Sequence, residues 1–261
     1  TVNGRPASVA NRSFVVAGIP LASGDNVLTA VATDESGNVG EARITVHLET
    51  APAPRVTIVS GNHQEAVIGS VLPEPLVVTL LDALGQPVAG KPVLFKLRGN
   101  NGSLDGGKRR IAVVTDAAGR ASAHFTLGTR AGVGNQVVEA TSPGFRGPAV
   151  FTATALHGAP ASIVVDAGDQ QVGIAGRELP RPLVAVVIDA GHNRLAGAAV
   201  KLEVVKGTGH FPGGLQELLA FSDSDGRVIG PFTRDLEEGI ANNIVEASIE
   251  GLDPSPVATF V

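Results

Sequence analysis

Aspartates that precede a glycine by three positions are the residues whose type and spacing most directly suggest chemistry. A carboxylate that opens a tight turn can accept hydrogen bonds from the free backbone amides of that turn, which requires no metal. Calcium would instead need several oxygens converging at about 2.3–2.6 Å. We expect turn capping at these positions, which are Asp34, Asp82, Asp116 and Asp223, with a looser version at Asp189.

Calcium is the alternative use of these carboxylates, and a small set of acids could supply it. Two of its members are turn aspartates, one is a second acid in the turn of residues 223–226, and one lies near the start of the second repeated module. These weak calcium candidates are Asp34, Asp166, Asp223 and Asp225. We expect no other metal and no cofactor.

Catalytic patterns are missing from the sequence. Six histidines stand at positions 47, 63, 124, 157, 192 and 210, and no two of them are spaced by three or four residues as a helical metal or base pair would be. The sequence contains no Gly-x-Ser-x-Gly motif, and its glycine-rich stretch at 207–214 lacks the lysine of a phosphate-binding loop. We therefore predict that the chain is not an enzyme.

The composition excludes further classes of site. There is no Cys, Met, Trp or Tyr among the 261 residues, so disulfides, cysteine-bound zinc and iron–sulfur clusters are ruled out. Sugar-binding surfaces commonly stack rings on Trp or Tyr, and only Phe145 and Phe211 fall in apparent loops, where we expect packing. A glycan ligand is therefore not expected. No apolar run approaches the roughly 18 residues that cross a bilayer, which predicts no membrane insertion.

Charge is distributed unevenly along the chain. The net charge is −2 over residues 1–51, +4 over residues 52–156 and −7 over residues 157–261. Solvated loop tips are the favoured explanation, and steering of contacts between modules or sister chains is the alternative. Nucleic acid is not expected, because the pI is near 5.7 and no aromatic residues accompany the basic cluster. The residues that could take part in such contacts are Lys108, Arg109, Arg110, Asp235, Glu237 and Glu238.

An internal repeat organises the sequence. Displaced by 107 residues, residues 61–154 match residues 168–261 at 29 of 94 positions without a gap. Self-similarity at a fixed period indicates a tandem array of modules. We therefore predict a short first module over residues 1–51 and two repeated modules over 52–156 and 157–261. Proline holds a chain extended, so Pro54 and Pro160 are expected to stiffen the two joints.

The modules show the period of β-strands. Val93, Phe95 and Leu97 share one face of a predicted strand, while Lys96 and Arg98 share the other. The stretch 215–221 could form one helical turn, but its repeat counterpart at 108–114 has the pattern of a strand. Many short strands in modules of about 105 residues predict antiparallel β-sandwiches. The glycines expected to shape their turns are Gly90, Gly197, Gly119 and Gly226.

The order of motifs resembles the bacterial immunoglobulin-like modules of the invasin/intimin type (group 1). The motifs are Gly61-x-x-Gln64, Pro75 followed by an apolar run, Asp82 to Gly90, and Asp116-x-x-Gly119. The resemblance covers residues 52–261, although in the second copy one turn has drifted to His-Asn-Arg-Leu. Residues 1–51 resemble a different bacterial immunoglobulin-like module. The resemblance implies tandem antiparallel Ig-like β-sandwiches arranged as an elongated rod, in an extracellular or cell-surface bacterial protein.

Three functions stay open at this point. The favoured one is a non-catalytic stalk or spacer that presents a terminal functional domain. The second is an adhesin segment that contacts a host, a glycan or a sister chain through loops or strand edges. The third is an accessory segment of a large secreted enzyme or toxin. Because neither an initiator Met nor a leader pattern opens the sequence, we expect a piece of a longer protein.

Overall fold

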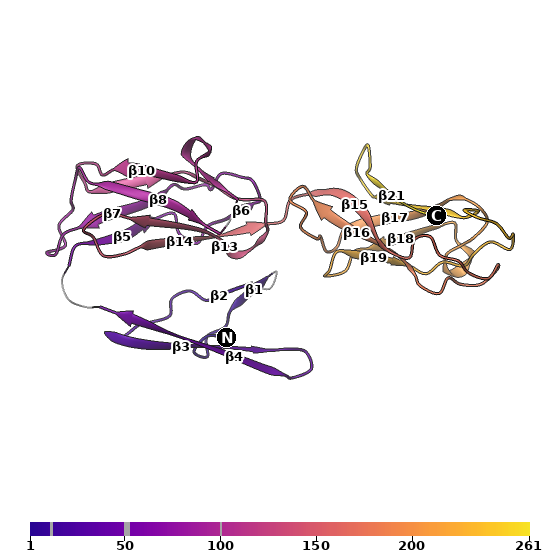
Figure 1. Ribbon diagram of the computed structural model, residues 1–261, viewed down its shortest axis with the longest axis horizontal. Helices are drawn as coiled ribbons and strands as arrows, with labels where there is room; N and C mark the ends of the chain where they lie inside the picture. Colours follow the sequence, from indigo (N-terminus) through magenta and orange to yellow (C-terminus); the bar gives the residue numbers. More distant parts are fainter. Residues whose placement is uncertain (11–12, 50–52, 100) are drawn as a thin grey trace. The chain divides into compact units, whose positions relative to one another are not determined.

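The computed structural model describes residues 1–10, 13–49, 53–99 and 101–261, and the side chain of residue 10 is left aside. The chain forms two compact units, Thr1–Leu156 (unit 1) and His157–Val261 (unit 2), each of which is built from strands (Figure 1). Among the described residues, helical structure is limited to two short 3-10 turns, η1 (Asp105–Gly107) and η2 (Pro212–Gly214). The predicted boundary between the first two modules, at residues 51 and 52, lies outside the described residues.

The larger part of unit 1 is a sandwich of two main sheets. Every neighbouring pair in them is antiparallel except β14 and β6, which are parallel. A small two-stranded sheet of β9 (Ser103–Leu104) and β12 (Phe125–Thr126) accompanies them. One main sheet has the order β11 (Arg120–Ala123), β7 (Leu76–Leu81), β5 (Arg55–Ser60). The other has the order β10 (Arg110–Val114), β8 (Pro92–Arg98), β13 (Gly132–Thr141), β14 (Ala149–Leu156), β6 (Glu65–Val67).

Unit 2 repeats the main strand order, without strands equivalent to β6, β9 and β12 among its described residues. In both units, the first strand of the sandwich pairs with the second long strand, and the third long strand lies between the antiparallel partner that follows it and the next-to-last strand. Two facing antiparallel sheets connected in this way are the immunoglobulin-like arrangement. The prediction of tandem Ig-like β-sandwiches is confirmed. The sheets of unit 2 are β15 (Pro160–Ala167), β16 (Leu183–Asp189), β19 (Arg227–Gly230) and, facing them, β18 (Glu217–Phe221), β17 (Ala199–Lys206), β20 (Ile244–Ile249), β21 (Val257–Phe260).

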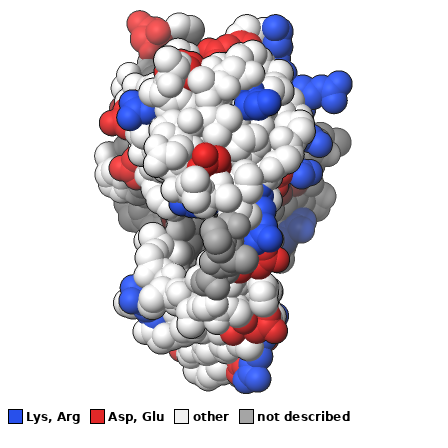
Figure 2. All heavy atoms as spheres, turned by 90° about the vertical axis from the view of Figure 1, so that its left-hand side faces the viewer, with Lys and Arg blue, Asp and Glu red and all other residues white. Residues whose placement is uncertain are grey.

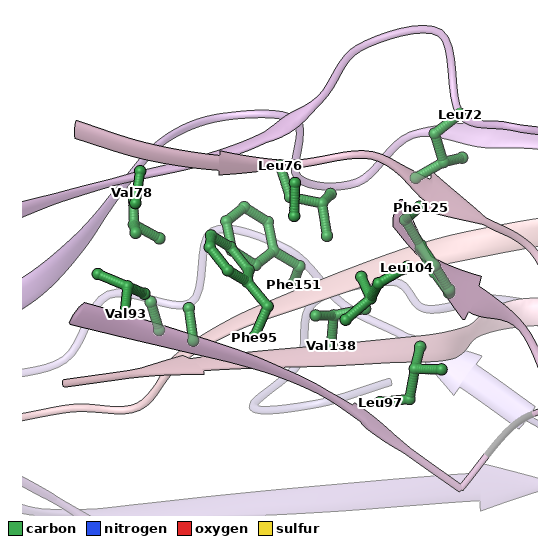
Figure 3. Packing of buried hydrophobic residues seen from close by; sticks show 14 of the residues in the cluster. Leu72, Leu76, Val78, Val93, Phe95, Leu97, Leu104, Phe125, Val138 and Phe151 are labelled. Carbon is green, nitrogen blue, oxygen red and sulfur yellow. The ribbon is translucent and has the colours of Figure 1, made fainter. Parts of the chain in front are cut away.

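Alternating side chains build the core of each sandwich. Along β8 every second residue is buried, so that Val93, Phe95 and Leu97 point inward as the sequence pattern predicts. Phe95 and Phe151, from the same sheet, have ring centroids 6.5 Å apart in the middle of this core (Figure 3). The core therefore consists of aliphatic side chains around a few Phe rings, without the disulfide or tryptophan of vertebrate immunoglobulin domains.

Two hairpins precede the sandwich of unit 1. They are β1 (Ser8–Ala10) with β2 (Ser13–Val15), and β3 (Gly24–Thr33) with β4 (Val39–Leu48). The Val15 side chain reaches β13, where a Cβ on Gly134 would lie 2.3 Å from it, and Glu49 forms an ion pair with Arg146. These contacts hold the first segment within unit 1.

The structure corrects the ungapped repeat alignment near the end of the chain. A displacement of 107 residues matches Phe151 with Ala258. In the sheets, however, Phe151 pairs with Val138, and Phe260 pairs with Val245, which is the counterpart of Val138. The last strand of unit 2 is therefore displaced by two further residues. The stretch considered for a helical turn forms strand β18, like its counterpart β10.

Candidate functional site

The turn aspartates all make the same pair of hydrogen bonds. In each case Oδ1 accepts from the backbone amides two and four residues later, at donor–acceptor distances of 2.8–2.9 Å. The carboxylate thereby satisfies amides that the turn leaves without partners. The turn that had drifted in sequence, at Asp189, keeps the same geometry. The five residues are Asp34, Asp82, Asp116, Asp189 and Asp223.

The fourth residue of each turn has a positive φ. Glycine occupies it in four turns, with φ between 69° and 84°, at residues 37, 85, 119 and 226. In the fifth turn the residue is His192, with φ of 62°. A type I turn followed by one left-handed residue is a common tight connection, so the backbone conformation favours glycine at this position. A residue with a Cβ is less stable than glycine in this left-handed conformation, so His192 lowers the free energy of unfolding of unit 2 relative to a glycine.

Hydrogen bonding lowers the pKa of two of these carboxyl groups. For Asp34 the main cause is the bond from the Asn38 side chain, followed by the Asn38 amide. Asp189 is buried, and burial raises its pKa, but bonds from Asn193 and from the amides of Gly158 and Gly191 outweigh burial and lower it. Both groups are therefore held as carboxylates by the turns that they close.

The acids considered for calcium are occupied by backbone amides and arginine. Asp166 Oδ2 accepts from Arg227 Nε at 2.8 Å, and Asp225 lies 3.9 Å from the same guanidinium. Asp166 also raises the pKa of Arg227 by hydrogen bonding and by charge. The structure thus brings Asp166 and Asp225 to one arginine, while Asp34 lies apart in the first segment. Among the described residues no three His, Cys, Asp or Glu side chains gather to hold a metal.

In each unit a buried hydroxyl group fixes a turn, and that turn contains Gly90 in unit 1 and Gly197 in unit 2. Thr115 Oγ1 donates to the Val88 carbonyl at 2.9 Å and accepts from the Lys91 amide at 3.0 Å. In unit 2, Ser222 makes the same two bonds, to the Leu195 carbonyl and from the Ala198 amide. The glycine amides in turn donate to the carbonyls of Thr115 and Ser222. Gly90 and Gly197 both have φ of 73°, a left-handed conformation that glycine adopts without steric cost.

A glutamine clamp in each unit is the feature that sequence reasoning missed. Gln64 Nε2 donates to the carbonyls of Gly61 and Glu74, and its Oε1 accepts from the Glu74 amide. Gln171 makes the same three bonds in unit 2, to Gly168 and Arg181. The signal was available in the repeat alignment, where both glutamines and both preceding glycines are identical. Three bonds from one side chain fix the loop that follows β5 to the loop that precedes β7 in unit 1, and the loop that follows β15 to the loop that precedes β16 in unit 2.

The prolines expected at joints lie at the start of the first strands. Pro54 is half-buried, and its carbonyl accepts from the Arg146 amide at 2.7 Å. Pro160 is the first residue of β15 and pairs with Asp189. Proline has no amide to donate, which suits a position at the end of an edge strand.

The basic and acidic clusters differ in exposure. Lys108, Arg109 and Arg110 are exposed, as are Glu237 and Glu238. The inclusion of Asp235 in the acidic surface was wrong, because its side chain is 6% exposed and accepts from the amides of Thr208 and Glu237. These amides, led by that of Glu237, lower its pKa. Figure 2 shows one face of the molecule, on which charges of both signs are scattered over a largely uncharged surface.

The loop phenylalanines pack as expected. Phe211 is fully buried, and its ring lies 5.5 Å from that of Phe232 in an edge-to-face arrangement. Phe145 is partly buried against the core of unit 1. Two histidines of unit 1 bond to residues distant in the sequence: His124 Nδ1 lies 2.9 Å from Asp105 Oδ1, and His63 Nδ1 lies 3.1 Å from Thr152 Oγ1. The first is a histidine–carboxylate pair and the second a histidine–hydroxyl pair, and no hydrogen bond among the described residues links the two pairs into one cluster.

Comparison with known proteins gives structural likeness at low sequence identity. No protein-family model matches the sequence, and no curated protein matches it. A crystal structure of invasin, described as a bacterial integrin-binding protein, is 18% identical with a TM-score of 0.35 and covers 80% of this chain. A tetra-tandem repeat from the extending region of a large adhesion protein is 15% identical, with a TM-score of 0.30 over 94% of this chain.

The cis-dimer structure of protocadherin gammaB7 is 12% identical, with a TM-score of 0.37 over 91% of this chain. The chain spans 39% of the invasin chain, 56% of the protocadherin chain and 58% of the adhesion repeat chain. The assignment of the fold rests on the strand order of each unit. No helix among the described residues has the length and apolar character needed to cross a membrane.

Proposed function

We propose that this chain is a non-catalytic spacer in a bacterial cell-surface or secreted protein, consisting of a short first module and two Ig-like modules in series. The observation that carries the proposal is that the polar side chains singled out in the sequence form hydrogen bonds to the backbone of their own unit. The turn aspartates, the hydroxyls of Thr115 and Ser222, and the two glutamines all bond to backbone groups of their own unit. Residues that could have done chemistry instead hold loops in place, and apart from Asp34 they stand at equivalent positions in the two repeats.

The joints support the same proposal. Gly158 donates to Asp189 Oδ2 at 2.9 Å and so belongs to the fixed part of unit 2, while β14 of unit 1 runs to Leu156. His157 alone stands between these two residues. A connection of one residue limits the angles that neighbouring modules can adopt, which is the property that a spacer needs.

Small-angle X-ray scattering of the 261-residue chain tests the spacer. Strands of about 6–8 residues at about 3.3 Å each make a sandwich roughly 35–45 Å long with its loops, so two sandwiches in series should span about 70–90 Å. A matched variant with four Gly-Ser residues inserted after His157 should broaden the distribution of distances. A compact particle for the original chain would contradict the proposal, and so would identical scattering from the two chains.

Contact with a neighbouring chain is the second candidate. The exposed basic cluster at residues 108–110 lies in unit 1, and the exposed Glu237 and Glu238 lie in unit 2. Opposite charges on the two units could direct one chain onto another. This candidate would make the segment part of an adhesive or assembling surface. The role of accessory segment in a larger secreted enzyme or toxin is compatible with the spacer and is decided by the flanking sequence.

A further inference from the structure

The larger sheet of each sandwich ends on one side in an unpaired strand, β10 in unit 1 and β18 in unit 2. The Thr115 amide donates to Lys91 next to β8, and the Ser222 amide donates to Ala198 next to β17. Because hydrogen-bonded positions alternate along a strand, three residues of each strand direct their amides and carbonyls away from the sheet. No described residue bonds to these backbone groups. The residues are Arg110, Ala112 and Val114 in β10, and Glu217, Leu219 and Phe221 in β18.

The outward side chains of β18 are large and apolar. With the displacement of 107 residues, Leu219 stands where unit 1 has Ala112, and Phe221 stands where it has Val114. Leu219 is 59% exposed and Phe221 is 66% exposed. A free strand edge with exposed apolar side chains readily pairs with another strand, and folded proteins usually avoid this combination. β18 therefore has the properties of a strand that binds a partner strand.

The edge of β10 is basic instead of apolar. The exposed basic cluster at residues 108–110 leads into this strand. Charged side chains on an edge, and Lys above all, hinder pairing between two edges of the same kind. The corresponding residues 215–217 of unit 2 are Leu-Gln-Glu, which carry no positive charge. Two β10 edges would therefore repel each other, whereas β10 and β18 would not.

Antiparallel pairing of β10 with β18 matches the side chains of the two edges. When Ala112 lies opposite Leu219, the small side chain leaves room for the large one. In the same register Arg110 lies opposite Phe221, where a guanidinium group can stack on the ring. The free amides and carbonyls of the two strands then bond to one another, as in other cases where a strand is added to a sheet edge.

The ends of the two strands are complementary in charge. Because the paired strands run in opposite directions, the start of β10 meets the turn that follows β18. The basic cluster at residues 108–110 then lies beside Asp223 and Asp225, both of which are exposed. Pairing of β18 with a second β18 would place no cation beside this turn, and pairing of β10 with a second β10 would bring two basic clusters into one interface. The charges therefore favour the mixed pair.

We propose that β18 of one chain pairs antiparallel with β10 of a second copy. The larger sheets of the two sandwiches then continue into each other, and their outward side chains lie on one common face. Because each chain has one edge of each kind, the contact is heterologous and can continue from chain to chain. The inference rests on the second candidate function, contact with a neighbouring chain, and the spacer function does not depend on it.

Two variants of the full chain that each block one edge test the pairing by sedimentation velocity. The first combines Lys108→Glu, Arg109→Glu and Arg110→Glu and keeps β18, while the second, Leu219→Lys, keeps β10. We expect neither variant to associate alone and an equimolar mixture to form a dimer, because only the mixture offers one intact edge of each kind. Leu236→Lys changes another exposed leucine of unit 2 and should associate like the unchanged chain. Self-association of either blocked variant, or a mixture that stays monomeric, would overturn the proposal.

Hydrogen exchange in the same mixture separates strand pairing from contact through charges alone. In the charge-reversed variant, the amides of Leu219 and Phe221 should exchange about tenfold more slowly once Leu219→Lys chains are added. The Ile229 amide lies on the free edge of the facing sheet and should keep its exchange rate. A dimer in which the Leu219 amide also keeps its rate would overturn strand pairing, while the broader candidate of contact between neighbouring chains would stand.

Discussion

At the scale of single residues, the residue types at the turns are explained by two requirements of the backbone: a hydrogen-bond acceptor for free amides, and a residue that tolerates a positive φ. An aspartate that accepts two amides and a residue with positive φ three positions later recur in five turns. The sequence predicts the capping role well, because the aspartate and the glycine stand at a fixed separation. It does not predict that Asp235 is buried, since the run Asp-Leu-Glu-Glu has the composition of an exposed loop.

Replacing His192 with glycine should stabilise unit 2. The His192 side chain is exposed while its backbone has φ of 62°, and a left-handed conformation costs a residue with a Cβ about 1–2 kcal/mol. We expect His192→Gly to raise the free energy of unfolding by about 1 kcal/mol, measured by urea denaturation followed by circular dichroism. The converse change, Gly85→His in the equivalent turn of unit 1, should lower it by a similar amount. No change in either variant would contradict this account of the turn.

Asp189 should make the stability of unit 2 depend on pH. Its pKa is below the ordinary value of 3.8 in the folded protein, so the native state binds this proton more weakly than the unfolded state. The stabilisation is present above about pH 4 and is lost as the pH falls through the folded pKa. Asp189→Asn should cost about 1–2 kcal/mol at pH 7 and flatten the acid side of the pH profile in denaturation experiments. An unchanged acid slope would refute the role of this carboxylate.

At the scale of elements, the loops that close each sandwich are fixed by contacts between distant segments. The alternating patterns predict the strands and their inward faces. The glutamine clamp could not be predicted in the same way, because it depends on two loops ten residues apart in sequence meeting in space. The two-residue displacement of β21 was not found either. The alignment used one fixed offset, and the many identities before β21 support that offset along the rest of the module.

Gly61 and Gly168 should tolerate no side chain. A Cβ at Gly61 would lie 2.2 Å from the Pro75 carbonyl oxygen, and one at Gly168 would lie 2.1 Å from that of Pro182. Both residues also have positive φ. We expect Gly61→Ala or Gly168→Ala to destabilise its unit by about 3 kcal/mol or more, measured by thermal or urea unfolding. Gly90→Ala is the matched control: φ is positive there too, but no atom lies within 4 Å, so the expected loss is about 1 kcal/mol.

At the scale of the whole molecule, the two repeated modules carry net charges of opposite sign. The net charge is +4 over residues 52–156, to which the exposed cluster at residues 108–110 contributes, and −7 over residues 157–261. If these charges direct chains onto one another, self-association should weaken as salt rises, because screening shortens the reach of surface charges to about 3 Å at 1 M salt.

Sedimentation velocity at low and high salt measures this effect. Reversing the charge of Lys108, Arg109 and Arg110 together should abolish association at low salt, whereas reversing Arg120, a basic residue of the same unit outside the cluster, should change it little. A chain that stays monomeric at every salt concentration would rule out charge-directed assembly.

The parallel pairing of β6 with β14 has a consequence under tension. These two strands lie close to opposite chain ends of their sandwich, so pulling the chain at both ends draws parallel neighbours past each other along their length. Their hydrogen bonds then resist together in shear, and none can open alone as it would in a peeled hairpin.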